Sequence, residues 1–243
     1  AGGFFIYAST VVKFVASKSR IPAEQLSRVI LLPQSTVHEG RSGIDLLYSQ
    51  VLEQAVNDVD ADDEDEEQIH SRFKAVVGTA LLVFNPLSVR ALSDLLKVPN
   101  TSTTLRSLHS LLLVPDSEKM ADPIRPFHKP FPDFLTDPKR CKDERFFVKP
   151  GVYHAEILLS CLNLMRERLG KNICNLDDYA ILSEVKDLSV RRKDYIGDAL
   201  EYACQFWTKH LLEIPSSSPC VEEVQKGVIA LLLPLKTGPT KYH

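Results

Sequence analysis

The stretch Ile124–Asp137 holds the residues best suited to chemistry in this chain, a histidine followed by a proline-initiated aromatic segment. His128 ends a short extended run, and Pro130 suits the first turn of a helix. A protonated imidazole, with an ordinary pKa of about 6.5, donates a charge-assisted hydrogen bond to phosphate. Just before a helix N-terminus it would share that corner with N–H groups aligned for anions. The alternative is a partly buried histidine that closes a hairpin and bonds to a carbonyl, and the residues alone favour this alternative.

Sequence motifs for catalysis or metal binding are absent. The chain has no Gly-x-x-x-x-Gly-Lys-Ser/Thr loop to cradle a triphosphate and no apolar strand that ends in an acidic pair for magnesium. It also has no Gly-x-Ser-x-Gly elbow, no His-Glu-x-x-His helix and no dinucleotide-binding turn. Its seven histidines lie at no ligand spacing. We therefore expect no catalytic residue, no metal site and no enzyme activity in this chain by itself.

Composition and charge exclude several classes of partner. The 243 residues, 44% hydrophobic and 25% charged, suffice for one large or two small domains. The net charge of −3 gives no global field that would draw the chain onto nucleic acid or a membrane. The apolar run Phe4–Ala16 is shorter than the roughly 20 residues that a membrane span needs. The five cysteines are scattered, which favours a reduced, cytoplasmic setting over zinc ligation or disulfides.

Apolar residues recur at helical spacing along most of the chain, and we expect a mainly α fold. Ile44, Leu47 and Tyr48, for example, begin a repeat at i, i+3 and i+4. Leu112–Val114 and Ile124–His128 are short extended runs on either side of a polar turn, and we expect them to pair as a hairpin. The expected helices span residues 3–17, 22–32, 44–56, 69–84, 89–98, 103–113, 152–169, 177–185, 196–211 and 221–233.

The order of these elements predicts a helical domain, a winged-helix domain with a short β-hairpin, and further antiparallel helices. Three compact helices followed by a hairpin are typical of a winged helix. The acidic block 58–67 has eight Asp or Glu in ten residues and indicates a solvated linker, because such dense carboxylates repel one another. The expected regions are a small helical domain (1–57), the acidic linker (58–67), the winged-helix domain (68–148), a helical domain or the start of helical repeats (151–226) and an irregular tail (227–243).

A winged helix also suggests DNA binding, which the charge pattern disfavours. The recognition helix would be Thr101–Leu113, where Arg106 is the single basic residue apart from a histidine. Phosphate contacts supply most of the affinity for DNA, so one arginine is too little charge. We therefore expect no nucleic-acid partner.

Four segments of the chain resemble fungal NACHT proteins, which are NLR-like members of the STAND class of signalling ATPases and include the heterokaryon-incompatibility type. The most specific is Pro126–Leu135, with the pattern His-x-x-Phe-x-x-Phe-Leu that begins at His128. The resemblance extends over nearly the whole chain to about residue 226. The other segments are Gly3–Thr10, Leu46–Leu52 and Tyr202–Leu211.

The resemblance implies a modular switch whose phosphate-binding core lies outside this chain. In the family, the winged-helix histidine contacts the β-phosphate of ADP and holds the closed, inactive state. By motif match that residue is His128, with Phe127, Phe131, Phe134 and Leu135 as core residues that hold it. The implied cofactor is ADP or ATP in the intact protein. The implied partners are the nucleotide-binding core, other proteins and further copies of the chain in an active oligomer.

Two departures from the family pattern limit what the resemblance carries over. Pro130 stands where the motif has a serine, and proline lacks both the hydroxyl and the backbone N–H. Phe4 and Phe5 stand where relatives have a proline near the adenine, so no adenine contact is assigned. The chain begins with Ala1 and is expected to be a fragment. The alternative function is a stand-alone helical scaffold for protein partners that binds no nucleotide.

Overall fold

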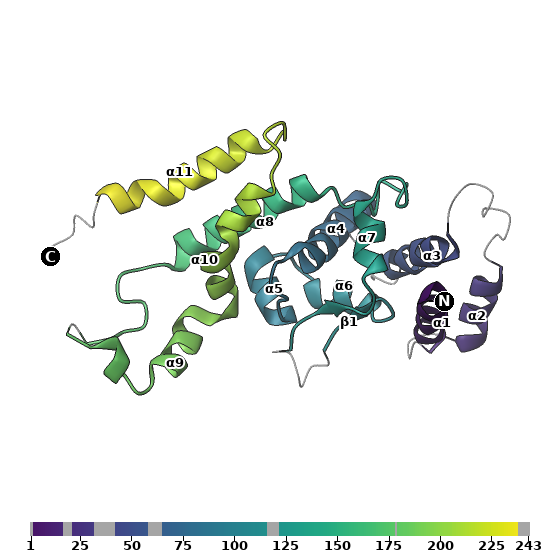
Figure 1. The fold of residues 1–243 in the computed structure, drawn as a ribbon, viewed down its shortest axis with the longest axis horizontal. Coiled ribbons are helices and arrows are strands. Elements are labelled where there is room, and N and C mark those ends of the chain that lie inside the picture. The colour runs from purple at the N-terminus through teal and green to yellow at the C-terminus, as the bar shows by residue number, and fades with distance from the viewer. Residues whose placement is uncertain are drawn as a thin grey trace.

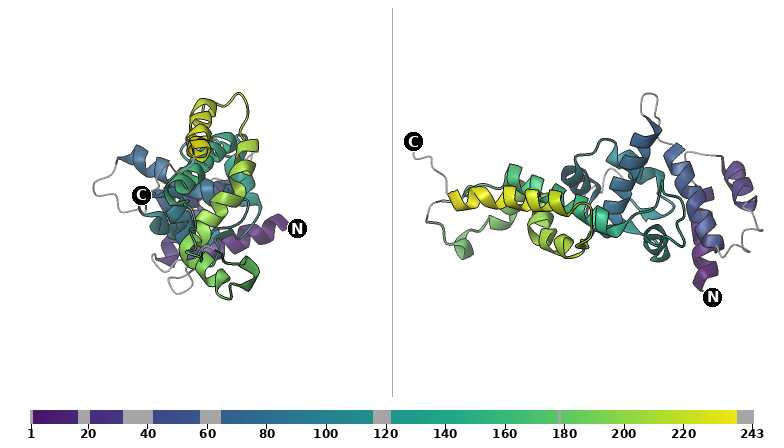
Figure 2. Two further views of the ribbon diagram at one scale, coloured as in Figure 1. Left: turned by 90° about the vertical axis from the view of Figure 1, so that its left-hand side faces the viewer. Right: turned by 90° about the horizontal axis from the view of Figure 1, so that it is seen from above.

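The computed structural model describes residues 2–16, 21–31, 42–57, 65–115, 122–177 and 179–237. Its helices follow chain order along an elongated molecule, with the first helices at one end and the last at the other (Figures 1 and 2). Helices and one small antiparallel sheet make up the regular structure of the described residues, which confirms the mainly α class. No helix in this part of the chain is long and apolar enough to cross a membrane.

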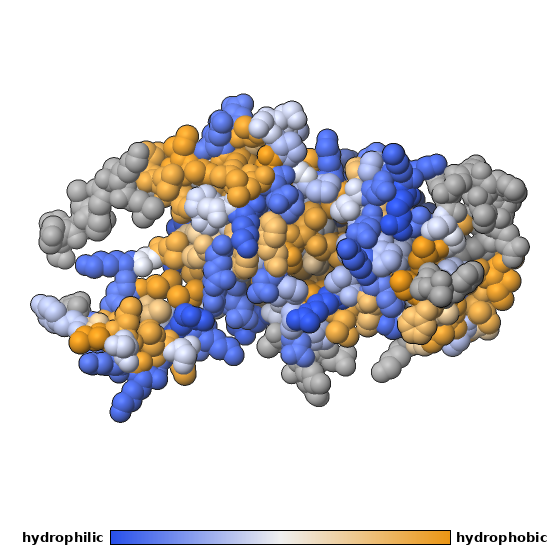
Figure 3. Space-filling model, in the orientation of Figure 1, coloured by the Kyte–Doolittle hydropathy of each residue, from blue (hydrophilic) through white to orange (hydrophobic). Residues whose placement is uncertain are grey.

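Helices α1 (Gly2–Val15), α2 (Pro22–Ile30) and α3 (Gly43–Asn57) form the N-terminal end, close to their expected spans. α1 packs against both α2 and α3. α3 supplies most of their core, with Leu47 and Leu52 fully buried. Part of the surface of α1 and α2 is apolar, at the lower right of the space-filling view (Figure 3). The exposed side chains there are Phe5, Val12, Leu26, Ile30 and Leu31.

Helices α4 (Glu66–Leu82), α5 (Val89–Leu96) and α6 (Thr101–Ser107) pack against one another in the middle of the molecule. The side chain of Ser88 caps α5, because its Oγ accepts the Ala91 N–H at 3.2 Å. The cap holds the tight connection between α4 and α5 in place.

A short hairpin follows these helices. β1 (Leu112–Leu113) pairs antiparallel with β2 (Arg125–Pro126), which is the pairing that the sequence predicts. The segment before β2 also joins the loop before α5, since the Ile124 N–H donates to the Leu87 carbonyl at 2.8 Å. β2 leads into α7 (Pro130–Thr136), so the histidine segment starts from a fixed strand.

Two expected boundaries in this region are wrong. The helix expected over 103–113 ends at Ser107, because Leu108 and Leu111 turn into the core and the following residues form β1. The linker expected over 58–67 gives up its last residues to α4, because carboxylates are favourable in the first turn of a helix. Residues 58–64 of that linker lie outside the described residues.

Helices α8 (Pro150–Arg168), α10 (Gly197–Leu212) and α11 (Val221–Thr237) form the C-terminal end, with α8 packed against both others. Gly227 allows α11 to lie close to α8, because a Cβ at this position would sit 3.0 Å from the Leu159 side chain. The close approach of these helices continues the core to Val224, which is buried on α11.

Two expectations for the C-terminal part are also wrong. The helix expected over 177–185 is reduced to a 3₁₀ turn at Leu182–Glu184, because its apolar residues remain exposed and have no core face to pack against. Regular structure resumes at α9 (Leu188–Arg191) and a π turn at Arg192–Ile196. The irregular tail expected over 227–243 is helical to Thr237, because the helix that packs on α8 continues. Residues 238–243 lie outside the described residues.

One continuous cluster of buried apolar side chains joins the long helices from α1 to α11. It extends from Phe14 on α1 through Leu92 on α5 to Leu200 on α10. Elements of the three expected regions, 1–57, 68–148 and 151–226, therefore share a core in the described part of the chain.

Candidate functional site

His128 lies in the corner between β2 and α7, where hydrogen bonds fix the backbone on both sides. The Phe127 N–H donates to the Leu111 carbonyl at 3.0 Å. The His128 carbonyl itself accepts the Phe131 N–H at 3.2 Å. The position of the partly buried imidazole is therefore set by the backbone of the hairpin and of α7.

The aromatic residues after His128 anchor this corner to α3. The rings of Phe131 and Phe134 lie 5.3 and 5.4 Å from the ring of Tyr48, measured between centroids. Both phenylalanines and Leu135 are buried, which confirms their prediction as core residues. Phe127, also predicted to be core, is only partly buried, and its ring contacts the ammonium of Lys13.

An ion pair adds a second tie between the corner and α3. The Arg140 Nη2 atom lies 2.5 Å from Asp45 Oδ1, and Arg140 Nε lies 3.3 Å from Asp45 Oδ2. The side chain of Asp45 is only 7% exposed, so the pair is sheltered from solvent. The same hydrogen bond raises the pKa of Arg140 further above its usual range. The geometry is the two-bond arrangement that arginine forms best with a carboxylate.

Lys13 of α1 brings a positive charge to the corner. Its Nζ atom lies over the Phe127 ring, 2.9 Å from the centroid. Such a cation–π contact stabilises by about 0.5–1 kcal/mol when exposed. Burial lowers the pKa of His128, and the neighbouring charge of Lys13 lowers it further. The imidazole is therefore neutral at neutral pH. Burial also lowers the pKa of Lys13 below its ordinary value, and its ammonium is the cation of the corner.

The Nε2 atom of His128 has unused bonding capacity. It is shielded from solvent and has no hydrogen-bond partner among the described residues. A buried polar atom without a partner costs about 1–3 kcal/mol. Within the same residues no hydrogen bond joins the imidazole to a carbonyl, so the hairpin-closing alternative gains no support.

The first turn of α7 does not supply the free N–H groups that we expected beside His128. Pro130 and Pro132 have no N–H, and the Phe131 N–H already donates to the His128 carbonyl. Asp133 adds a negative charge to the same turn. The expectation that the helix N-terminus contributes to anion binding is therefore wrong, and the positive charge comes from Lys13.

A second group of histidines lies at the junction of α8, α10 and the α4–α5 loop. His154 Nδ1 lies 2.8 Å from His210 Nδ1, and His210 Nε2 lies 2.7 Å from the Tyr202 hydroxyl. The Tyr202 oxygen also accepts the Phe84 N–H at 3.2 Å. Both histidines are buried, and the Phe84 ring packs against them. We call this set, Phe84, His154, Tyr202 and His210, the histidine relay.

Two patterns of protons satisfy the hydrogen bonds of the relay with both imidazoles neutral. In one, the Tyr202 hydroxyl donates to His210 Nε2 and His210 Nδ1–H donates to His154 Nδ1. In the other, both hydrogen bonds run in the opposite direction. Burial lowers the pKa of His210 to about 3, helped by the neighbouring His154. Burial also lowers the pKa of His154, against the opposing effect of Glu213. We therefore interpret the relay as an uncharged structural joint, a set of hydrogen bonds that holds α8, α10 and the α4–α5 loop together.

The spacing of residues in the sequence predicted neither the relay nor the position of Lys13 near His128. The two relay histidines are 56 positions apart, so no local ligand pattern links them. A signal was nevertheless present, because His154 and His210 fall within the apolar faces of their expected helices, and buried polar groups need partners. Lys13 carried no such signal, because its position beside His128 depends on how α1 packs.

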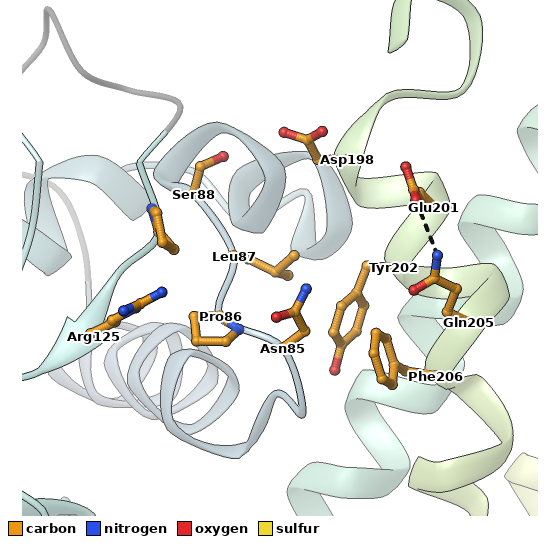
Figure 4. A pocket seen from close by; sticks show the side chains of 11 residues that line it. Asn85, Pro86, Leu87, Ser88, Arg125, Asp198, Glu201, Tyr202, Gln205 and Phe206 are labelled. Atoms are coloured by element: carbon orange, nitrogen blue, oxygen red, sulfur yellow. Dashed lines mark hydrogen bonds between the residues drawn. The ribbon is translucent and has the colours of Figure 1, made fainter. Parts of the chain in front are cut away.

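A surface cleft of about 330 Å³ lies beside the relay (Figure 4). Asp198, Glu201 and Tyr202 of α10 line one wall, and Arg125 lines the other. The Tyr202 hydroxyl points away from Asp198 toward the relay. Glu201 is already engaged by Arg192 at 3.3 Å and by a neighbouring glutamine. The cleft carries both signs of charge, and it does not include His128.

Neither the search for metal ligands nor the comparison with known proteins assigns a role to these residues. The described residues contain no group of three or more His, Cys, Asp or Glu placed to hold a metal ion. No protein-family model, curated protein or solved structure matches the chain.

Proposed function

We propose that this chain is the regulatory part of a NACHT-type STAND ATPase, in which His128 contacts the β-phosphate of ADP held by a separate nucleotide-binding core. The observation that carries the proposal is that Nε2 of His128 has no hydrogen-bond partner among the described residues, while the ammonium of Lys13 lies over the neighbouring Phe127 ring. A phosphate accepts hydrogen bonds and neutralises positive charge, so it fits both features. The four segments that resemble fungal NACHT proteins supply the class.

The proposed domains are a small helical domain (1–57), a winged-helix domain (68–148) and the start of a helical sensor region (151–226). Three packed helices and the β1–β2 hairpin support the winged-helix assignment. The Asp45–Arg140 pair and the packing of Tyr48 support a closed arrangement, because they join the first domain to the second. The winged helix serves protein contacts, since its third helix offers too few cations for DNA.

Nucleotide exchange drives the switch in this proposal. A ligand shifts a conformational equilibrium only through its different affinities for the two states. ADP favours the closed state because His128 contacts it there, and ATP releases that contact and permits homo-oligomerisation. The exposed apolar side chains of α1 and α2 support a further packing partner on this side of the molecule, for which the core is the proposed candidate.

The experiment compares His128→Ala with His109→Ala in a version of the protein that includes the nucleotide-binding core. His109 is an exposed histidine in the turn before β1 and serves as the matched control. We expect His128→Ala to release ADP about tenfold faster or more, the size of a lost charge-assisted hydrogen bond, and to increase the oligomeric fraction. ADP retention equal to that of the control would contradict the proposal.

A stand-alone scaffold remains the second candidate, because apolar side chains are exposed at both ends of the molecule (Figure 3). At the C-terminal end these are Ile229, Leu232 and Leu233 on α11. A scaffold would bind protein partners with the same affinity with and without nucleotide. A gene with no phosphate-binding loop upstream of Ala1 would favour it over the switch.

A further inference from the structure

The corner at His128 is assembled from two segments that are far apart in the sequence. α1 brings Lys13, and the turn between β2 and α7 brings Phe127 and His128. The ammonium of Lys13 lies over the ring of Phe127, which directly precedes His128 in the chain. The charge of Lys13 also lowers the pKa of His128. Two basic side chains thus meet where no carboxylate of the described residues pairs with either of them.

We propose that Lys13 and His128 together form a binding site for a phosphoryl group, in which Lys13 supplies the standing charge and His128 becomes charged when the anion binds. This inference rests on the proposed function and deepens it, because it names a second binding residue that the sequence pattern at His128 does not contain. The ligand class is a tetrahedral dianion such as a terminal phosphate.

Lys13 is the part of the site that can move. Its ammonium sits on a flexible four-carbon stem, whereas the backbone at His128 is bonded on both sides. His128 Nε2 is shielded from solvent, so an anion reaches it only after a local rearrangement. Exchange of the Phe127 ring for an anion replaces a weak cation–π contact of Lys13 by a charge-assisted hydrogen bond.

Binding at this site takes up a proton. Burial and Lys13 keep the pKa of free His128 below its usual value, and a bound dianion would raise it. The affinity therefore increases as the pH falls from the bound-state pKa toward the free-state pKa. The other charged groups close to His128 along the chain are Lys129 and Asp133, and neither contributes to this shift.

Sulfate is the probe, because it keeps both negative charges at neutral and mildly acidic pH, whereas phosphate takes up a proton there. The 243-residue chain is titrated with sulfate at constant ionic strength, with chloride as the balancing ion, and the imidazole NMR signals of His128 are followed. The variants are Lys13→Gln, Lys13→Arg and His128→Gln. Lys171→Gln is the charge-matched control, because Lys171 is exposed and follows α8, far along the chain from α1.

We expect Lys13→Gln to weaken sulfate binding about fivefold to tenfold, with Lys13→Arg and the Lys171 control close to the unmodified chain. The unmodified chain should bind more tightly as the pH falls, and His128→Gln should lose that dependence. Lys13→Met, which keeps an aliphatic side chain over Phe127, replaces the glutamine variant if that variant does not fold.

The outcomes separate the inference from the proposed function. If Lys13→Gln keeps full affinity for sulfate while His128→Gln loses affinity, Lys13 is not a binding residue. The proposed contact of His128 with phosphate would still hold in that case. Full affinity in both variants would overturn both. Loss in both variants, with the pH dependence absent only from His128→Gln, is the result that the shared site predicts.

Discussion

The corner at His128 and the histidine relay place imidazoles in opposite circumstances. In the relay, His210 uses both ring nitrogens and His154 uses Nδ1, in hydrogen bonds of 2.7 and 2.8 Å. At the corner, Nε2 of His128 has no partner in the described structure, and the charge of Lys13 lowers the pKa of the ring. The hydrogen bonds of the relay need no ligand, whereas no described residue forms a hydrogen bond with Nε2 of His128. The comparison separates a histidine that holds the fold from one that we propose to hold a nucleotide.

The largest expected difference between the two sites is in stability. His210→Ala should lower the free energy of unfolding by about 3 kcal/mol, because it removes a fully buried ring and the hydrogen bonds of that ring to the Tyr202 hydroxyl and to His154 Nδ1. Urea unfolding followed by circular dichroism measures this change. A loss below about 1 kcal/mol would mean that the relay is not a structural joint.

The second-largest expected effect is a loss of stability at acidic pH, caused by protonation of the relay. The folded-state pKa of His210 is about 3, and the unfolded value is about 6.5, so the unfolded chain binds the proton first. The stability that comes from neutral His210 is fully present above about pH 6.5 and is lost as the pH falls toward about 3. At pH 5 the loss from His210 alone is about 2 kcal/mol.

Unfolding curves at about pH 7.5 and 5 test this prediction, with His109→Ala as a control that keeps the full dependence on pH. In the His210→Ala variant, the free energy of unfolding should fall less between these two pH values than in the unmodified chain. An equal fall in both proteins would mean that other groups cause the sensitivity to acid.

The tie between α3 and the corner should have an intermediate effect. Asp45→Asn should lower the free energy of unfolding by about 1–2 kcal/mol, because Arg140 then lies partly buried without its counter-charge. A double-mutant cycle with Arg140→Met isolates the pair and should give a coupling of about 1 kcal/mol. A coupling near zero would show that aromatic packing alone holds α3 to the corner.

The smallest effect on stability is expected at His128 itself. His128→Ala should change the free energy of unfolding by less than about 1 kcal/mol, because Nε2 makes no hydrogen bond within the described residues that the mutation could remove. The value is measured in the same urea experiment as His210→Ala. A loss as large as at His210 would make His128 a structural residue and remove the contrast.

Helices with a regular apolar repeat were predictable from the sequence. α3, α8 and α10 lie within a few residues of their expected spans, because each buries a continuous apolar stripe. The hairpin was also predictable, since two short extended runs flank a polar turn.

The errors arise where tertiary packing overrides the local pattern. α6 ends early because the next leucines turn inward and join β1, and the segment 177–185 has apolar residues but no surface to bury them. α11 extends past its expected end because it packs along α8. Contacts between side chains from distant segments could not be predicted from the sequence either. The sequence therefore indicated His128 as a candidate residue, but neither Lys13 nor the relay.

The most direct test of the central claim follows histidine ring nitrogens by NMR while ADP is added to the protein that includes the nucleotide-binding core. The account predicts a shift of the His128 Nε2 signal on ADP binding, with a rise in the pKa of this ring. The signals of His154 and His210 should stay unchanged, because their Nδ1 atoms already bond to each other. An unchanged His128 signal at saturating ADP would contradict the account.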